Sequence, residues 1–408
     1  MNRTALIMSD AFAAYNFGKH HPLKPERVLL TWELITGLKL HERPDVVIVE
    51  PKMASDEEIA ILHEKNYIEF VKHVSALLDK GSLPEREVIQ GFKYNLGPGD
   101  NPVFPKMHEG SAIVAGGTMI AADTAWEDNN IDTVFNAAGG LHHAMANRAA
   151  GFCIYNDPAI AIKHLLKKHA KESPRIMYID IDAHHGDGVQ AAFYDNPDVL
   201  TVSIHESGEY LFPGTGFLEE QGEGQGDGFA VNIPLLPYTY DDLYLDIFDD
   251  IVPALAKAFQ PDLILSQNGV DTHCTDPLAN LGLTTRGHRE VFTRIHDLAK
   301  QHAGGKLVAI GGGGYNLSVV PRSWTMLFAE LCGALDELPT DIPEALLGRL
   351  NDGRVSDIIP PAFIDDGPSQ EIKIRMDNYK FMDMMELHAA QLRLKIQGTI
   401  IPKIEGRR

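Results

Sequence analysis

The stretch RIMYIDIDAHHGDG, residues 175–188, decides the fold class. It begins with apolar and β-branched residues, which predict a buried strand, and passes directly into His, Asp and Gly. Similar apolar runs recur at residues 4–9, 46–49, 133–135, 199–204, 262–266 and 306–310. Helical patterns lie between them, for example at residues 109–125, 158–168 and 243–259. This alternation predicts an α/β fold with a mostly parallel sheet and helices on both faces.

Length and composition are those of a globular protein. The chain has 408 residues, of which 44% are hydrophobic and 23% are charged. One large domain or two smaller ones fit this length. Residues 80–105 and 207–228 are rich in turn-forming residues and are expected to be long surface loops. The alternation ends near residue 360, and one amphipathic helix is expected around residues 382–397.

Charge and cysteine content exclude several classes of partner and site. The formal charge is −21, and such a field repels phosphate backbones, so nucleic acid is not expected as a partner. No apolar run approaches the ~18 residues of a membrane span, so no membrane is expected either. The three cysteines are an odd number and lie far apart, which argues against a disulfide framework and favours a reducing cytoplasm. Composition leaves the oligomeric state open.

Ionisable side chains directly follow several of the predicted strands. In open α/β sheets, ligands bind beyond the carboxyl ends of the strands. Because such groups follow four or five separate strands here, we expect them to form one convergent site. These groups lie in residues 139–143, in residues 180–188, at His205, at Asp271 and in residues 311–315.

A metal site is the strongest prediction from these groups. Asp180, Asp182 and His184 alternate, so in extended backbone their side chains lie on one side. Their apolar neighbours favour burial over a turn with solvated acids, and burying them without a partner or a metal would be costly. Two His with one Asp would suit zinc, and so would one His with two Asp if Asp271 is the third ligand. Three protein ligands leave one coordination position open, as in hydrolytic zinc sites that acidify water. An all-oxygen site would instead favour magnesium or calcium.

Two further groups suit acid–base and oxyanion chemistry. His142 and His143 form a tandem pair, and Asp180 and Asp187 are available to fix their tautomers. A glycine run at residues 311–314 lets the backbone approach a ligand and places Tyr315 beside it. A tyrosine hydroxyl there can donate to a developing oxyanion. Phe152 and Phe212, each near glycine, are candidates for the walls of a narrow apolar slot.

Together these motifs resemble the zinc-dependent histone deacetylase family, which has an arginase/deacetylase-like fold. Within the family they are most similar to the bacterial acetoin-utilisation deacetylases. The resemblance covers roughly residues 10–322, and the segment THCT at residues 272–275 departs from it. The matching blocks are HPLKPER (21–27), DNPVF (100–104), GGLHHA (139–144), GFCIYND (151–157), DIDAHHGDG (180–188), YDNPD (194–198), FPGTG (212–216), SQNGVD (266–271) and GGGGYN (311–316).

The resemblance implies a role for each matching residue. Zn²⁺, with Fe²⁺ as the alternative in vivo, would be held by Asp182, His184 and Asp271. His143, paired with Asp187, would be general base and then acid, although the sequence leaves open which histidine transfers the proton. His142, paired with Asp180, would stabilise charge, and Tyr315 would polarise the acyl carbonyl. The substrate would contact Asp100, Gly151, Phe152, Phe212 and Leu278. Structural K⁺ would lie at Asp180, Asp182, His184, Ser203 and Ile204, and Arg27 would line an exit channel.

The resemblance also implies a function and a domain plan. It implies a catalytic domain over residues 1–360 and a partly helical extension over residues 361–408, packed on the domain or mobile. The expected reaction is metal-dependent removal of acetyl groups from lysine side chains of an acetylated protein or peptide, with acetylated acetyl-CoA synthetase as a target. The alternatives are an acetylpolyamine or other small-molecule amide deacetylase, a non-catalytic acyl-lysine binding module, and a binuclear manganese hydrolase of the arginase type.

Overall fold

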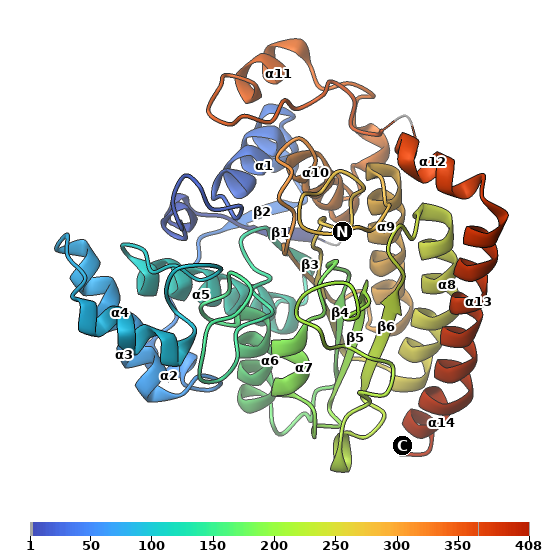
Figure 1. Cartoon of the computed structure of the whole chain (residues 1–408), viewed down its shortest axis with the longest axis horizontal. Coiled ribbons are helices and arrows are strands. Elements are labelled where there is room, and N and C mark those ends of the chain that lie inside the picture. The colour runs from blue at the N-terminus through green and yellow to red at the C-terminus, as the bar shows by residue number, and fades with distance from the viewer. Residues whose placement is uncertain (1–2, 366, 408) are drawn as a thin grey trace.

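A single parallel sheet of eight strands forms the centre of the molecule (Figure 1). The computed structural model describes residues 3–365 and 367–407. The strand order is β2-β1-β3-β8-β7-β4-β5-β6, and every neighbouring pair is parallel. The predicted α/β class is therefore confirmed. The strands are β1 Arg3–Ile7, β2 Val46–Val49, β3 Ile131–Asn136, β4 Ile176–Asp180, β5 Val199–Glu206, β6 Ala230–Leu235, β7 Leu263–Gln267 and β8 Leu307–Ile310.

Helices cover both faces of the sheet (Figure 1), so its central strands β4 and β7 are buried along their whole length. α5 contacts both α3 and α6, and α1, α10, α9 and α8 form a second connected series. The helices are α1 Glu26–Gly37, α2 Asp56–Ile59, α3 Lys65–Asp79, α4 Glu85–Gly91, α5 Met107–Glu127, α6 Asp157–Lys168, α7 Asp187–Ala192, α8 Asp241–Phe259, α9 Thr285–His302, α10 Val320–Leu331, α11 Glu344–Leu350, α12 Gln370–Met376, α13 Tyr379–Lys395 and α14 Ile401–Glu405. Within the part of the chain that the structure describes, no helix combines the length and apolarity that crossing a bilayer requires.

The topology brings the predicted functional segments together. β3, β8, β7 and β4 are consecutive neighbours in the sheet, although they are far apart in sequence. Their carboxyl ends meet at one edge, as the ends of parallel strands must. The loops that follow carry the tandem histidines, the glycine run with Tyr315, Asp271, and the Asp182–His184 motif, in that spatial order.

Two segments differ from the sequence-based expectation. Residues 80–105 do not form one continuous loop, because α4 begins after Pro84 with two glutamates in its first turn, where the helix dipole favours acids. β6 was not expected, since Pro234 interrupts its apolar pattern. A proline in a strand is confined to sheet edges, and β6 is an edge strand.

The C-terminal segment packs along the outside of α8, where Figure 1 shows α13 as the outermost helix. Met385, Ala389 and Leu392 of α13 are buried. His388 Nε2 donates to the carbonyl of Pro234, 2.7 Å away, so α13 also covers the edge strand. Residues 366 and 408 of the expected extension, and residues 1–2 of the expected domain, lie outside the described residues.

Candidate metal-dependent active site

Asp182, His184 and Asp271 form a buried cluster at the ends of β4 and β7. One ligand atom from each lies within 4.8 Å of the others. His184 Nδ1 is 3.1 Å from Asp182 Oδ1 and 3.0 Å from Asp271 Oδ2. An imidazole nitrogen facing two carboxylate oxygens is the donor set of a three-ligand divalent metal site.

The surrounding groups aim this donor set at a common point. Gln267 Nε2 and the Gly313 N–H each donate to Asp182 Oδ2 at 2.7 Å, and the Ala183 N–H donates to Asp271 Oδ1 at 2.8 Å. Each carboxylate therefore has one oxygen held in place and the other turned toward His184. A Cβ at Gly313 would collide with both carboxylates, so only glycine fits there.

Electrostatics support a cation at this point. Burial, and then repulsion from Asp182, raise the pKa of Asp271 to about 6. Burial alone would raise the pKa of Asp182 too, but attraction to His142 and the hydrogen bond from His184 outweigh burial and hold this pKa well below its usual range. Two carboxylates this close therefore stay ionised together only with positive charge beside them. The residues therefore fit a divalent metal ion, and we refer to Asp182, His184 and Asp271 as the metal set.

The two histidines that follow β3 each pair with a carboxylate. His142 Nδ1 is 2.7 Å from Asp180 Oδ2, and His143 Nδ1 is 2.7 Å from Asp187 Oδ1. Asp187 begins α7, where the helix dipole favours a carboxylate. These contacts fix Nδ1 of both rings as donors and turn Nε2 of each toward the interior of the site.

The electrostatic surroundings shift the pKa values of the two histidines in opposite directions. Burial alone would lower the pKa of His142, but attraction to Asp180 and Asp182 outweighs burial and raises this pKa to about 9. Burial, followed by repulsion from His142, lowers the pKa of His143. His142 is therefore the more basic of the two rings, and their Nε2 atoms lie 3.0 Å apart.

Tyr315 is held from two sides at the end of the glycine run. Its N–H donates to Asp276 Oδ2 at 2.8 Å, and Asp276 Oδ1 accepts the N–H of Leu278 at 2.9 Å. On the other side Arg27 Nη1 donates to the carbonyls of Gly312 and Gly314, at 2.6 and 3.2 Å. Burial, followed by repulsion from Asp271 and Asp182, raises the pKa of the Tyr315 hydroxyl well above its usual value, so it stays a hydrogen-bond donor.

Phe152, Gly151 and Phe212 form an aromatic slot over these groups. The ring of Phe152 lies edge-on to Tyr315, with centroids 5.6 Å apart, and the ring of Phe212 lies edge-on to His143 at 5.0 Å. A Cβ at Gly151 would collide with His143 and lie 3.0 Å from the Phe212 ring. Glycine at residue 151 therefore leaves the space that the rings of His143 and Phe212 occupy.

The remaining predicted residues surround this centre. Ser203 and Ile204 are buried in β5, and Ser203 lies beside Asp180 in the sheet register. The side chains of Asp182 and His184 are engaged in the metal set. Asp100 is exposed, so its carboxylate does not join the buried groups. Leu278 is half-buried in the loop that Asp276 ties to Tyr315.

Sequence reasoning missed the supporting residues Tyr15, Asn101, Gln267 and Asp276. Each is a single polar residue, and its partner lies far away in sequence or in an irregular loop. Gln267 and Asn101 lie inside segments that the family resemblance covers, which was the available signal. None of the four belongs to a periodic sequence pattern that would identify it as part of the site.

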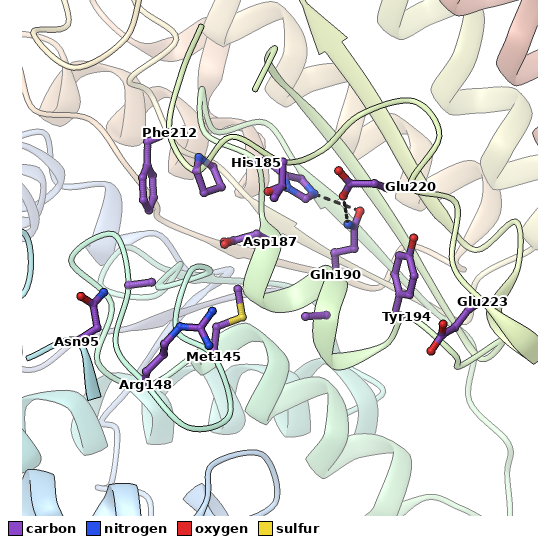
Figure 2. A pocket seen from close by; sticks show the side chains of 14 residues that line it. Asn95, Met145, Arg148, His185, Asp187, Gln190, Tyr194, Phe212, Glu220 and Glu223 are labelled. Carbon is purple, nitrogen blue, oxygen red and sulfur yellow. Dashed lines mark hydrogen bonds between the residues drawn. The ribbon is translucent and has the colours of Figure 1, made fainter. Parts of the chain in front are cut away.

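A cavity of about 660 Å³ borders the slot and shares Phe212 with it. Figure 2 shows Arg148 and Met145 on one side of this cavity and Tyr194 and Glu223 on another. Asp187 also lines this cavity (Figure 2), and its side chain is 11% exposed. Solvent therefore reaches the carboxylate that orients His143.

A second group of ligand-type side chains, Asp123, Glu127 and His169, lies at the surface. Lys168 Nζ forms ion pairs with Asp123 and Glu127, at 2.9 and 2.7 Å. The lysine already supplies the positive charge that a metal would bring. This cluster is therefore an ion-pair network and serves below as a control for the metal set.

Comparisons with known proteins identify the family of this chain. The family model of the histone deacetylase domain matches residues 21–331. The acetoin utilization protein AcuC of Bacillus subtilis is 46% identical over 334 residues, 82% of this chain and 83% of that protein. The AcuC protein of Staphylococcus aureus strain MRSA252 is 41% identical over 332 residues, 81% of this chain and 82% of that protein.

Solved structures show the same fold. The crystal structure of a histone deacetylase homologue from Aquifex aeolicus superposes with a TM-score of 0.80 and 32% identity. The superposition covers 95% of this chain and 100% of the Aquifex aeolicus chain. The structure of a homologue complexed with SAHA is matched to the same extent. On the family model, the sequence identity and the shared architecture, the chain belongs to the histone deacetylase family.

Proposed function

We propose that this deacetylase hydrolyses the acyl amide of acetyl-lysine side chains in proteins, releasing acetate and free lysine. One observation carries the proposal: the metal set, both histidine–carboxylate pairs and Tyr315 meet at the base of the aromatic slot. A slot walled by Phe152 and Phe212 suits an unbranched methylene stem that ends in a polar group.

The metal set would hold one divalent ion. Zn²⁺ is the ion that we propose, with Fe²⁺ as the alternative, and it would supply Lewis acidity to the acyl carbonyl and acidify the attacking water. Three side chains form the set, so a bound ion would keep a coordination position for water or substrate. A structural K⁺ ion would be held beside it by Asp180, Asp182, His184, Ser203 and Ile204.

His143 is the proposed proton carrier. Its ring lies beside both the slot and the metal set, with its centroid 5.0 Å from that of Phe212 and 5.9 Å from that of His184. Nε2 of His143 would accept the proton from water and return it to Nζ of the leaving lysine, while Asp187 holds the ring in place. His142, charged beside Asp180, would stabilise the negative charge that develops on the acyl oxygen.

Tyr315 would complete the charge stabilisation. Its hydroxyl would donate to the acyl oxygen as negative charge grows there, which is the role of an oxyanion donor. Arg27 lies behind the glycine run that carries Tyr315. We propose that it also lines the inner channel through which acetate leaves.

Acetate release from an acetyl-lysine peptide tests this function. We expect metal-free protein to be inactive, and added Zn²⁺ or Fe²⁺ to restore release of one acetate per free lysine. Acetylspermidine is the competing substrate, since the charge of −21 would attract a polyamine. A higher kcat/KM for acetylspermidine would replace lysine by polyamine as the substrate class. Binding of the peptide by metal-loaded protein without acetate release would favour the non-catalytic module.

We further propose acetylated acetyl-CoA synthetase as a protein substrate. The similarity to proteins of acetoin utilisation supports a substrate in acetate metabolism. The expected result is loss of acetyl-lysine from the acetylated synthetase, followed by mass spectrometry, together with recovery of its activity. An acetylated protein that keeps its modification while the peptide is hydrolysed would restrict the proposal to other targets.

A further inference from the structure

Phe152 has a backbone conformation that its residue type disfavours. Its φ is +67°, in the left-handed region that non-glycine residues rarely adopt. The preceding Gly151 is also left-handed, with φ +48°. A strained conformation of this kind persists only where its surroundings hold it in place.

Both polar groups of the Phe152 backbone are held by side chains. Its N–H donates to Asn101 Oδ1 at 2.9 Å, and its carbonyl accepts the hydroxyl of Tyr15 at 2.6 Å. The same hydroxyl accepts the N–H of Ile154 at 3.1 Å. Asn101 and Tyr15 are 3% and 5% exposed, so these hydrogen bonds are shielded from water.

His21 connects Phe152 to Asp100, which lies at the rim of the slot. His21 Nδ1 accepts the N–H of Leu23 at 3.1 Å, which fixes the proton on Nε2. His21 Nε2 therefore donates to the carbonyl of Asp100, 3.2 Å away. The His21 ring also lies edge-on to the Phe152 ring, with centroids 4.5 Å apart. Asp100 and Asn101 are thus tied to the slot wall by two independent contacts.

We propose that Asn101 and Tyr15 are positioning residues that hold Phe152 in its strained conformation. They thereby determine how tightly the slot binds the substrate stem. Asn101 also joins the wall to the rim, because it directly follows Asp100. The inference rests on the proposed function for the identity of the stem. It goes further in assigning the shape of the slot to two residues that contact neither the metal set nor the histidine pairs in the described structure.

The wall contacts the stem equally before and during the reaction, so its loss removes uniform binding and raises KM more than it lowers kcat. Asn101→Ala leaves the buried Phe152 N–H without an acceptor, and KM is expected to rise about 10-fold with kcat within about threefold. Asn101→Asp keeps the accepting oxygen and should restore most of the KM. Tyr15→Phe removes the contact on the carbonyl side and should shift KM in the same direction as Asn101→Ala.

A double substitution separates positioning from a general structural role. If Asn101 acts through Phe152, Asn101→Ala should change KM by less than about twofold in a Phe152→Ala background. Asn147→Ala, which removes an exposed side chain, is the matched control and should leave KM unchanged. Thermal unfolding identifies any variant that is lost to misfolding, in which case Tyr15→Phe carries the test.

The substrate is whichever of acetyl-lysine peptide and acetylspermidine the wild-type enzyme hydrolyses faster. If neither is hydrolysed, the proposed function fails, and Kd for the acetyl-lysine peptide replaces KM with the same expected ratios. The proposal is overturned if Asn101→Ala and Tyr15→Phe leave KM or Kd unchanged. It is equally overturned if the effects of Asn101→Ala and Phe152→Ala are additive, or if Asn101→Asp is as impaired as Asn101→Ala.

Discussion

Replacing Tyr315 with phenylalanine is expected to lower kcat by about 100- to 1000-fold while KM changes little. Loss of one oxyanion donor removes roughly 3 kcal/mol of transition-state stabilisation, and the bound ground state does not depend on it. The ring contacts with Phe152 and Arg27 do not involve the hydroxyl, so they survive the substitution. Steady-state kinetics on the acetyl-lysine peptide measure both constants.

Tyr240→Phe is the matched control for this prediction. The Tyr240 hydroxyl contacts Met382 Sδ at the C-terminal segment, so its removal should leave kcat unchanged. A kcat for Tyr315→Phe within about threefold of wild type would contradict the oxyanion assignment. The pKa of the Tyr315 hydroxyl is well above its usual value, so the deficit should be constant between pH 6 and 8.

Asp276 offers a second test of the same assignment. Its carboxylate holds the backbone of Tyr315 and of Leu278, so Asp276→Ala should displace the hydroxyl and lower kcat. In a Tyr315→Phe background no hydroxyl remains to displace, and Asp276→Ala should then have little further effect on kcat. Additive losses would assign Asp276 a role that does not pass through Tyr315.

The sequence predicted the fold and the convergence of the site for one physical reason. In a parallel α/β sheet, residues just beyond the strands must meet at one edge, so Asp182, Asp271 and Tyr315 could be brought together without coordinates. The family resemblance then supplied the role of each residue, and those roles remain proposals. β6 was missed because its Pro234 is tolerated only at a sheet edge, and edge position is a tertiary property.

The supporting residues could not be predicted, because their contacts depend on tertiary structure and not on position after a strand. Tyr15 and Phe152 are 137 positions apart, and Gln267 and Asp182 are 85 apart. No local pattern distinguishes a buried asparagine that accepts a backbone N–H from one that caps a turn. Phe152 looks like a core aromatic in sequence, and only its left-handed backbone shows that other residues must hold it.

Replacing Asp271 with asparagine is expected to strip the metal from the protein. The amide keeps an oxygen for the Ala183 N–H, so the backbone stays supported, but the charged oxygen that faces His184 is lost. Loss of a group that only supports a ligand weakens metal binding by about 10- to 100-fold, and loss of a ligand should exceed that range. Elemental analysis after dialysis should find less than a tenth of the wild-type metal content, and acetate release should fall in parallel.

Two further variants provide an intermediate effect and a control for the loss of metal. Gln267→Leu removes the amide that holds Asp182 Oδ2 and should weaken metal binding about 10- to 100-fold, less than Asp271→Asn does. Asp123→Asn alters the surface cluster of the same residue types, where Lys168 already neutralises the acids, and should leave metal content unchanged. If Asp123→Asn lost as much metal as Asp271→Asn, the ion would lie at the surface cluster, and neither the metal set nor the chemistry built on it would stand.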